Sequence, residues 1–370
     1  MNITTLDPSG LWLGRVERTD IGPCVVTFRS GRVIDITSKT APTTRDIMER
    51  DDACDFVRNA VGEDLGPLEA KHQWLAPCDL QSIKACGVTF AGSMVERVIE
   101  EKATGDPTRA QVIRAKIAAR IGESLSEIVP GSEAATAVKQ ALIEEGLWSQ
   151  YLEVGIGPDA EVFSKAQVLS SVGYGADVGL HPISTWNNPE PEVVLAVNSR
   201  AEIKGATLGN DVNLRDVEGR SALLLSKAKD NNASCAIGPM IRLFTEGYTL
   251  DDVRQAKLTL TVTGEDGFVL DGSSSMSQIS RDPADLVAQT IGRHHQYPDG
   301  LMLFLGTLFA PTKDRDTRGG GFTHKLGDVV TIANTHLGAL TNTVRLSTEC
   351  SEWTFAASHF MRNLAIRGLL

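Results

Sequence analysis

The pattern that most constrains the fold begins near residue 160. From there on, short apolar runs alternate with turns that contain Gly, Asn and Asp. Leu or Val alternates with Thr over residues 258–262, as in a half-buried strand, and a Gly-Glu-Asp-Gly turn then leads into a second apolar run. Further strands are expected at 301–305, 328–333 and 337–345. Many short strands with few long helices favour a sandwich or roll over an alternating β-α-β fold.

The first part of the chain mixes helix and strand patterns. Two apolar runs, 24–28 and 32–36, flank a Ser-Gly turn and predict a β-hairpin. A helical stretch is expected at 44–61, and it is followed by a less regular segment rich in Gly and Pro. We therefore predict a small N-terminal α+β domain over residues 1–75.

The remaining residues, 76–370, are predicted to form the larger domain. Amphipathic periodicity indicates a helical insertion over about 98–150, and strand patterns dominate after it. The predicted fold class is therefore α+β: a small N-terminal α+β domain, followed by a mixed β roll with helical insertions.

Charge and composition exclude some classes of protein. The formal net charge of -11 speaks against nucleic acid as a partner, because phosphate binding needs clustered Lys and Arg. No apolar run approaches the ~18 residues of a membrane span, and the N-terminus lacks the basic start and apolar core of a signal peptide. The six cysteines are scattered and form no CxxC pair, which is typical of reduced thiols. We expect a cytoplasmic protein without a membrane partner.

Three carboxylates form a candidate metal site. Glu190 and Glu192 flank a proline directly before the apolar run 193–197. Residues i and i+2 of a strand point to the same face, so both carboxylates can converge on one cation. Asp211 supplies a third carboxylate about twenty residues later. Taken singly, such a Glu pair is usually a solvated face and an Asn-Asp pair a turn, but together they favour a hard ion: Mg²⁺ first, with Mn²⁺ or Ca²⁺ as alternatives.

Two lysines follow these carboxylates along the chain. Lys227 and Lys229 lie shortly before a Cys-Ala-Ile-Gly-Pro segment that begins at Cys235. A lysine beside a carboxylate-bound metal can hold a substrate carbonyl or carboxylate, and it can stabilise an enolate. Any single lysine is ordinarily a solvated surface residue, so the prediction depends on the joint pattern.

In this order and spacing, the three elements resemble the fumarylacetoacetate hydrolase family. That family carries a Glu-x-Glu strand, then Gly-Asn-Asp-x-x-x-Arg-Asp, then a Lys followed by Cys-x-x-Gly-Pro. The Lys-to-Cys interval gives Lys229, rather than Lys227, the catalytic position. Residues 305–307 resemble the family's Gly-Thr-Pro turn, and residues 325–330 resemble its Lys-Pro-Gly-Asp strand start. The resemblance covers roughly residues 80–345 and implies a fumarylacetoacetate-hydrolase-like fold.

One segment departs from the family pattern. The family's Cys-Val-Gly-Arg-Asn-Tyr-x-x-His-x-x-Glu gives a His-Glu pair over the metal, whereas residues 86–96 retain Glu96 but have Ser93 in place of the His. Hydrolysis of a C–C bond needs an activated water, for which a His-Glu pair is suited. Dehydration of a 2-keto-3-deoxy acid instead needs a Lewis acid, a base at C3 and an exit for hydroxide. Together with the sequence Trp-Asn-Asn-Pro-Glu-Pro-Glu at residues 186–192, this departure favours a resemblance to the 2-keto-3-deoxypentonate dehydratase branch of the family.

The resemblance implies a role for each site residue. The metal ligands are Glu190, Glu192 and Asp211, with Glu96 as the base and Lys229 as the group that stabilises developing negative charge. The substrate contacts are Ser93, Phe90, Thr307 and Arg215. The implied cofactor is Mg²⁺, and the implied partners are a small 2-keto acid and further copies of the chain in a homodimer or higher homo-oligomer.

Two other functions stay open from the sequence. The implied reaction converts a 2-keto-3-deoxy sugar acid, a pentonate, to a 2,5-dioxo acid such as 2,5-dioxopentanoate. The same-family alternative is C–C hydrolysis of an acylpyruvate or another 2,4-diketo acid, with Glu96 alone activating the water. The alternative from another class is a keto-acid binding protein that has lost catalysis. Retention of Glu96 and Lys229 counts against that alternative, because binding alone needs no base over the metal.

Overall fold

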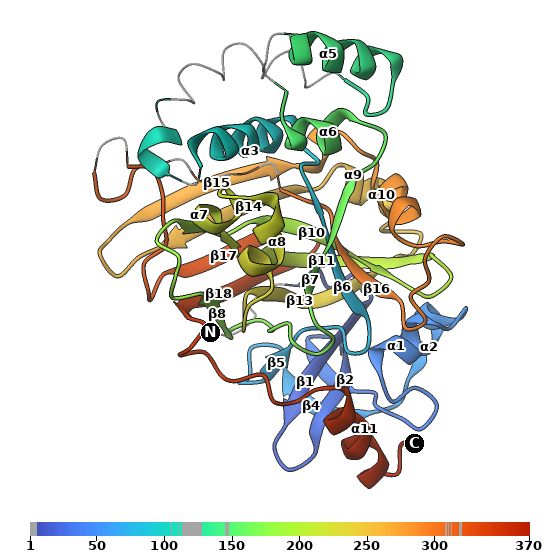
Figure 1. Cartoon of the computed structure of the whole chain (residues 1–370). Coiled ribbons are helices and arrows are strands. Elements are labelled where there is room, and N and C mark those ends of the chain that lie inside the picture. The colour runs from blue at the N-terminus through green and yellow to red at the C-terminus, as the bar shows by residue number, and fades with distance from the viewer. Residues whose placement is uncertain are drawn as a thin grey trace.

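The computed structural model describes residues 6–104, 106–110, 112, 128–144, 148–307, 309, 311, 313–317 and 320–370. Two mixed sheets form the centre of the molecule, and helices lie at both ends of it (Figure 1). Each sheet contains one parallel pair of strands among antiparallel neighbours. The architecture is therefore a mixed β structure with helices, as the sequence predicts.

The larger sheet runs through most of the molecule. Its strand order is β4-β3-β2-β1-β13-β11-β10-β16-β6-β7, and β5 pairs with β1. The strands are β1 (Trp12–Arg18), β2 (Gly22–Arg29), β3 (Arg32–Asp35), β4 (Glu63–Pro67), β5 (Gln73–Leu75), β6 (Ser82–Gly87), β7 (Glu161–Ala166), β10 (Pro191–Val197), β11 (Ile203–Asp211), β13 (Cys235–Leu243) and β16 (Leu301–Phe304). Because β10, β11 and β13 lie in its middle, their backbones are paired on both sides and their residues are buried.

The second sheet lies against the middle of the first. Its strand order is β15-β14-β17-β18-β8, and a short separate pair joins β9 to β12. The strands are β8 (Asp177–Leu180), β9 (Asn187–Asn188), β12 (Asn213–Leu214), β14 (Lys257–Thr263), β15 (Val269–Ser275), β17 (Val329–Asn334) and β18 (Gly338–Leu346). Alternate apolar residues of β14, such as Leu258 and Leu260, join the same buried cluster as Leu195 and Leu208 of the larger sheet. The core therefore lies between the two sheets.

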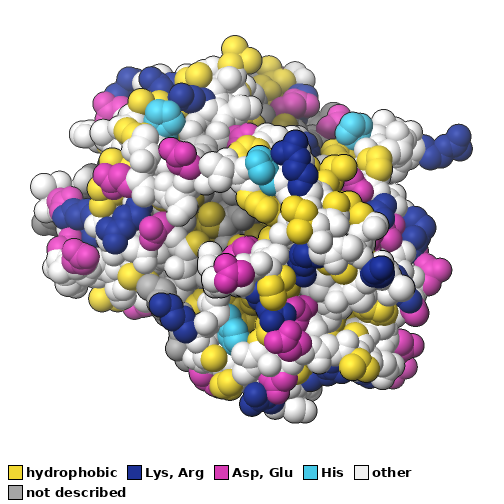
Figure 2. Space-filling view, turned by 90° about the horizontal axis from the view of Figure 1, so that it is seen from below, with side chains coloured by type: hydrophobic (Ala, Val, Ile, Leu, Met, Phe, Trp, Pro, Cys, Tyr) yellow, Lys and Arg dark blue, Asp and Glu magenta, His cyan; other side chains and the backbone are white. Residues whose placement is uncertain are grey.

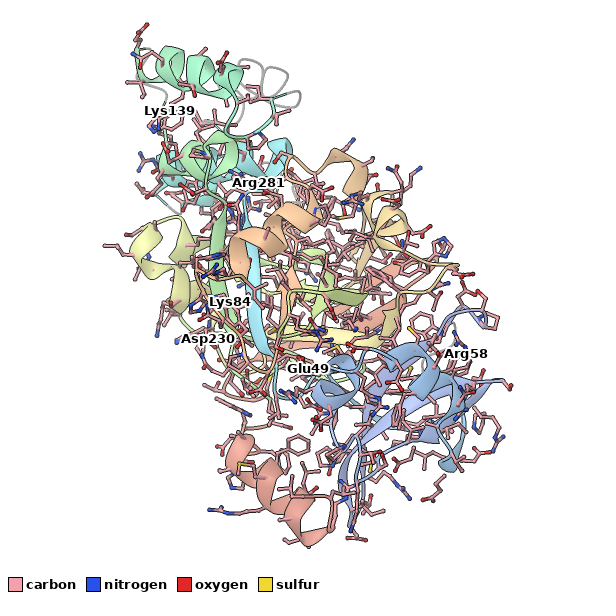
Figure 3. All side chains as sticks on the ribbon, turned by 90° about the vertical axis from the view of Figure 1, so that its right-hand side faces the viewer. Glu49, Arg58, Lys84, Lys139, Asp230 and Arg281 are labelled. Atoms are coloured by element: carbon pink, nitrogen blue, oxygen red, sulfur yellow. The ribbon has the colours of Figure 1, made fainter. Side chains whose placement is uncertain are left out.

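Helices flank the sheets at both ends of the molecule. The helical elements are α1 (Thr44–Met48), α2 (Ala53–Asn59), α3 (Ala91–Ala103), α5 (Glu133–Glu144), α6 (Gln150–Ile156), α7 (Arg215–Glu218), η1 (Ala222–Leu224), α8 (Leu225–Lys229), α9 (Leu250–Arg254), η2 (Met276–Gln278), α10 (Pro283–Thr290) and α11 (Ala357–Ile366). Lys139 of α5 lies at one end, and the C-terminal helix α11 lies at the other, with Glu49 and Arg58 between them (Figure 3). Among the described helices, none is long and apolar enough to cross a membrane.

The N-terminal strands continue the larger sheet. Strand β1 pairs with β2 on one side and with β13 on the other. Backbone hydrogen bonds therefore join the N-terminal strands to the central strands in one continuous sheet. The hairpin of β2 and β3 and the strands β14 to β18 lie where the sequence predicts them. The predicted boundary near residue 75 coincides with the end of β5 and stays a prediction.

One face of the molecule, seen in Figure 2, carries charges of both signs. Lys and Arg side chains are interspersed with Asp and Glu over the described part of this face. Surfaces of this mixed kind are ordinary for a globular protein and identify no ligand by themselves. The chemistry of the protein therefore has to be sought in its buried polar groups.

Close packing between the central strands explains why residue 209 is a glycine. A Cβ added at Gly209 would lie 2.2 Å from the ring of Phe304 and 2.6 Å from Val194. We expect Gly209→Ala to lower the free energy of unfolding by about 1–3 kcal/mol, because overpacking displaces its neighbours. Urea denaturation measures this, with Gly247→Ala as the control, since the nearest atom there is 4.0 Å away. Equal stability of the two variants would contradict the packing seen here.

Candidate active site

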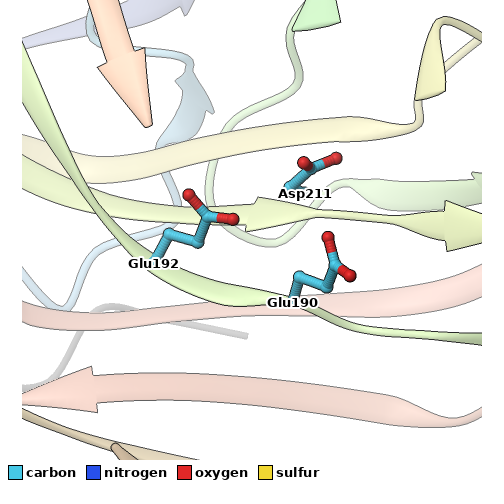
Figure 4. A group of neighbouring side chains, drawn as sticks. All are labelled: Glu190, Glu192 and Asp211. Atoms are coloured by element: carbon cyan, nitrogen blue, oxygen red, sulfur yellow. The ribbon is translucent and has the colours of Figure 1, made fainter. Parts of the chain in front are cut away.

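Strand pairing brings the three predicted metal ligands together. Glu192 lies on β10, Glu190 directly precedes that strand, and Asp211 ends β11. Glu192 is opposite Gly209 in the antiparallel pair, and the Asp211 backbone N–H donates to the Glu190 carbonyl at 3.0 Å. One oxygen from each carboxylate lies within 4.8 Å of the others, and all three residues are buried (Figure 4). The prediction that the Glu-x-Glu pair shares one face is confirmed.

The chemistry of these ligands fits a hard cation. The three buried groups offer oxygen only, which suits Mg²⁺, Mn²⁺ or Ca²⁺. Glu192 Oε2 accepts a hydrogen bond from the Gly306 N–H at 2.6 Å. Burial, reinforced by Asp211 and Glu190, raises the pKa of Glu192 well above its usual range. A divalent ion would offset this cost by stabilising the ionised carboxylates.

Lys229 contacts two of the three ligands. Its ammonium lies 2.5 Å from Glu190 Oε2 and 3.0 Å from Asp211 Oδ2. Burial opposes the charge of Lys229, but Asp211 and Glu190 outweigh burial and raise its pKa above the usual range. Lys227, in the same short helix α8, is exposed. The geometry therefore brings Lys229, and not Lys227, to the carboxylates.

The ligands line a small cavity of about 20 Å³. That volume suits roughly one water molecule, so a keto acid requires the surrounding side chains to move. Thr307, predicted to contact substrate, lines the cavity, and its hydroxyl accepts a hydrogen bond from the Phe309 N–H at 3.2 Å. The other lining residues are Cys86, Gly87, Val88, Arg97, Glu161, Phe163, Glu190, Glu192, Asp211, Glu218, Lys229 and Gly306.

Arg215 and Phe90, both predicted to contact substrate, are not among the described residues that line the cavity. Arg215 is buried, and its guanidinium lies 3.2 Å from Glu96 and stacks 4.4 Å from the centre of the Trp186 ring. Phe90 directly precedes α3 and packs in the main hydrophobic core. Ser93 belongs to α3, but its side chain lies outside the described part of the chain. The roles predicted for these residues stay predictions.

Three charged residues that line the cavity were not predicted from the sequence: Arg97, Glu161 and Glu218. Arg97 of α3 contacts Glu190 at 2.5 Å and Glu218 at 2.8 Å. Glu161 of β7 faces Gly87 of the neighbouring strand β6, where a Cβ would lie 2.0 Å from its Oε2. Burial raises the pKa of Glu161. A signal for Glu161 was present, because Glu161 and Phe163 alternate with other residues along β7 and so share one face.

A buried carboxylate triad at the centre of a mixed β roll defines this protein's class. Residues 174–345 match the sequence profile of the fumarylacetoacetate (FAA) hydrolase C-terminal family. The match covers just under half of the chain, and with it the resemblance and the fold class predicted from the sequence are confirmed.

Two curated proteins from archaea are similar over about half of the chain. A "Probable 2-keto-3-deoxyxylonate dehydratase" of Haloferax volcanii is 29% identical over 201 residues, which are 54% of this chain and 65% of that protein. A "2-dehydro-3-deoxy-D-arabinonate dehydratase" of Saccharolobus solfataricus is 30% identical over 188 residues, which are 50% of this chain and 58% of that protein. The match thus covers less than two thirds of either relative's own length.

Solved structures support the fold over most of the chain. An apo "2-keto-3-deoxy-D-arabinonate dehydratase" superposes with a TM-score of 0.62 at 20% identity, covering 90% of this chain and 99% of that chain. A structure of the same enzyme complexed with magnesium and 2,5-dioxopentanoate has a TM-score of 0.61 at 19% identity, with the same coverage. At these identities the likeness concerns the fold.

Removal of one triad carboxylate should weaken metal binding. We expect the purified chain to bind one Mn²⁺ ion, and Glu192→Gln to weaken that binding at least about tenfold, because an amide gives the ion no charge. Titration followed by electron paramagnetic resonance measures free Mn²⁺ directly. Glu246→Gln, at an exposed glutamate, is the control and should bind as the wild type does. Equal affinity for all three proteins would place the ion elsewhere.

The two lysines of α8 should differ sharply in function. Lys229→Met removes the cation that contacts Glu190 and Asp211, so turnover should fall about 10²-fold or more. Lys227→Met changes an exposed side chain and should leave turnover within about twofold of the wild type. Steady-state kinetics on the two variants measure the difference, and circular dichroism checks that both are folded. A loss of turnover in Lys227→Met alone would refute the assignment of Lys229.

Proposed function

We propose that the chain is a Mg²⁺-dependent dehydratase that removes water from a 2-keto-3-deoxy sugar acid, a pentonate, and yields a 2,5-dioxo acid such as 2,5-dioxopentanoate. The observation that carries this proposal is the contact of Lys229 with two members of the buried carboxylate triad, at 2.5 and 3.0 Å. A cation-binding site beside a fixed ammonium suits a reaction that develops negative charge on a keto oxygen. The names of the two archaeal relatives support the same reaction class.

In this proposal, Glu190, Glu192 and Asp211 hold the ion, which supplies a Lewis acid for the carboxylate and keto oxygens of the substrate. A carboxylate base takes a proton from C3, and the electron pair moves to the keto oxygen. The ammonium of Lys229 stabilises that oxygen. When the enolate collapses, the C4–O bond breaks, and the hydroxyl leaves as water with the proton from the base. C5 then loses a proton as C3 gains one, and the resulting enol becomes the aldehyde at C5.

Two carboxylates compete for the role of base. The family resemblance favours Glu96, whose side chain contacts Arg215 at 3.2 Å and is not among the residues that line the cavity. Glu161 lines the cavity, and burial raises its pKa, which suits a group that accepts and returns a proton. Glu161 therefore already lies on the cavity wall, whereas the described contact of Glu96 is with Arg215.

A substrate panel tests the proposed reaction. The purified protein with Mg²⁺ is offered 2-keto-3-deoxypentonates, 2-keto-3-deoxyhexonates and acylpyruvates, and mass spectrometry detects the loss of water or C–C cleavage. Dehydration of a pentonate that stops with a chelator and returns with Mg²⁺ is the expected result. Cleavage of an acylpyruvate without any dehydration would replace the proposal with hydrolysis. Binding of keto acids without turnover would replace it with a binding protein.

Substitution of each candidate in turn shows which of the two carboxylates is the base. The true base, changed from Glu to Gln, should lose roughly 10²–10⁴-fold in kcat. If Glu96 has the role that the family resemblance implies, Glu96→Gln should show this loss. If the base is instead the carboxylate that lines the cavity, Glu161→Gln should show it. Ser93→His tests the departure from the family, because it should raise acylpyruvate hydrolysis if the missing His is what favours dehydration. Full dehydration by both Gln variants would rule out a carboxylate base at either position.

Two further parts of the proposal concern the setting of the enzyme. We propose a homo-oligomer in the cytoplasm, acting on a small keto acid. Sedimentation analysis and fractionation of cells test these two parts directly. Neither is required for the chemistry at the carboxylate triad.

A further inference from the structure

A fully buried lysine lies next to the triad without lining the cavity. Lys165 lies on β7 and has no exposed surface. Glu161 and Phe163 precede it on the same strand and line the cavity. The pairing of β7 with β6 shifts register at Lys165, so its contacts rather than simple alternation place its side chain. Burying a lysine is costly unless its charge is paired, so its partners indicate its role.

The partners of Lys165 belong to the metal site and its neighbours. Its ammonium lies 2.8 Å from Asp211 Oδ1. It also donates to the Lys229 carbonyl at 2.5 Å and to the Val212 carbonyl at 3.2 Å. The two carbonyls are its hydrogen-bond acceptors, whereas Asp211 Oδ1 is its charge partner in an ion pair. Lys165 therefore connects a metal ligand with the end of the helix that carries Lys229.

The two oxygens of Asp211 have different neighbours. The Lys165 ammonium lies beside Oδ1, whereas Lys229 donates a hydrogen bond to Oδ2 and another to Glu190. The charge of Lys165 therefore competes with a cation for Oδ1. A positive charge this close also reduces the negative charge that Asp211 can offer to a cation.

We infer that Lys165 is a positioning residue that restricts Asp211 to one ligand oxygen and limits the negative charge of the triad. This inference rests on the proposed function, because it assumes that the triad holds a metal that acts as a Lewis acid. An ion whose ligands donate less charge polarises a keto group more strongly. Lys165 thus lowers the affinity of the triad for the metal and raises the reactivity of the bound substrate.

Removal of the Lys165 charge should change metal affinity and turnover in opposite directions. Lys165→Met frees Asp211 Oδ1 and removes a nearby positive charge, so Mn²⁺ should bind about tenfold more tightly or better. In the same variant, kcat at saturating metal should fall about 10–100-fold, with KM changed less. A merely structural role would weaken metal binding and turnover together. The Lys229 carbonyl keeps a partner in this variant, because the Ser234 hydroxyl donates to it at 2.8 Å.

The experiment compares Mn²⁺ titration with dehydration kinetics for the wild type and four variants. Lys84→Met is the matched control: Lys84 lies on the neighbouring strand β6 and donates to the Ser164 hydroxyl at 3.0 Å, away from the triad (Figure 3). It should change neither quantity by more than about twofold. Lys165→Gln repeats the loss of charge with a polar side chain, and Lys165→Arg retains the charge and should keep wild-type Mn²⁺ affinity within about threefold.

Each outcome decides for or against the inference. Tighter Mn²⁺ binding with slower turnover in Lys165→Met or Lys165→Gln supports it. Weaker or unchanged Mn²⁺ binding in the folded variants overturns it, as does failure of both neutral variants to fold. If the wild type dehydrates its substrate while the Lys165 variants behave normally, the inference alone fails. If Mn²⁺ binds more tightly in Lys165→Met but the wild type dehydrates no keto acid, the charge effect of Lys165 stands and the proposed function fails.

Discussion

The rest of the site depends on the burial of three carboxylates within 4.8 Å of one another. Like charges in a medium of low polarity repel strongly, and burial together with the charges of Asp211 and Glu190 raises the pKa of Glu192 well above its usual range. Lys229, Lys165 and Arg97 each contact Asp211 or Glu190 and offset part of this repulsion. These cations lower the cost of burying the three carboxylates, and a divalent ion would add further positive charge.

Backbone pairing creates this concentration of charge. The chain alternates sides along β10 and pairs it with β11, so the carboxylates are brought together by strand register and not by flexible loops. Small residues permit the approach, because Gly209 lies against Phe304 and the Gly306 N–H donates to Glu192. Ligands on rigid central strands need little reorganisation to hold an ion or to act in the transition state.

The sequence predicted those parts of the site that local pattern determines. The Glu-x-Glu spacing requires a shared face on any strand. The choice of Lys229 over Lys227 came from the resemblance to the family, whose Lys-to-Cys interval fits Lys229. The alternating apolar runs likewise predicted the mixed β fold. The contacts of Arg97 and Lys165 were not predicted, because they join α3 and β7 to strands far away in the sequence. Distance in three dimensions between such segments follows from packing, which periodicity does not encode.

The most direct test of this account is the position of the metal in a crystal soaked with Mn²⁺, read from anomalous scattering. The account predicts one strong peak bounded by Glu190, Glu192 and Asp211, with carboxylate oxygens at about 2.0–2.6 Å from the ion. It also predicts that Asp211 contributes one oxygen while the other stays with Lys165. A peak at another site, or no peak at metal concentrations that support turnover, would contradict the central claim that this triad is the catalytic metal site.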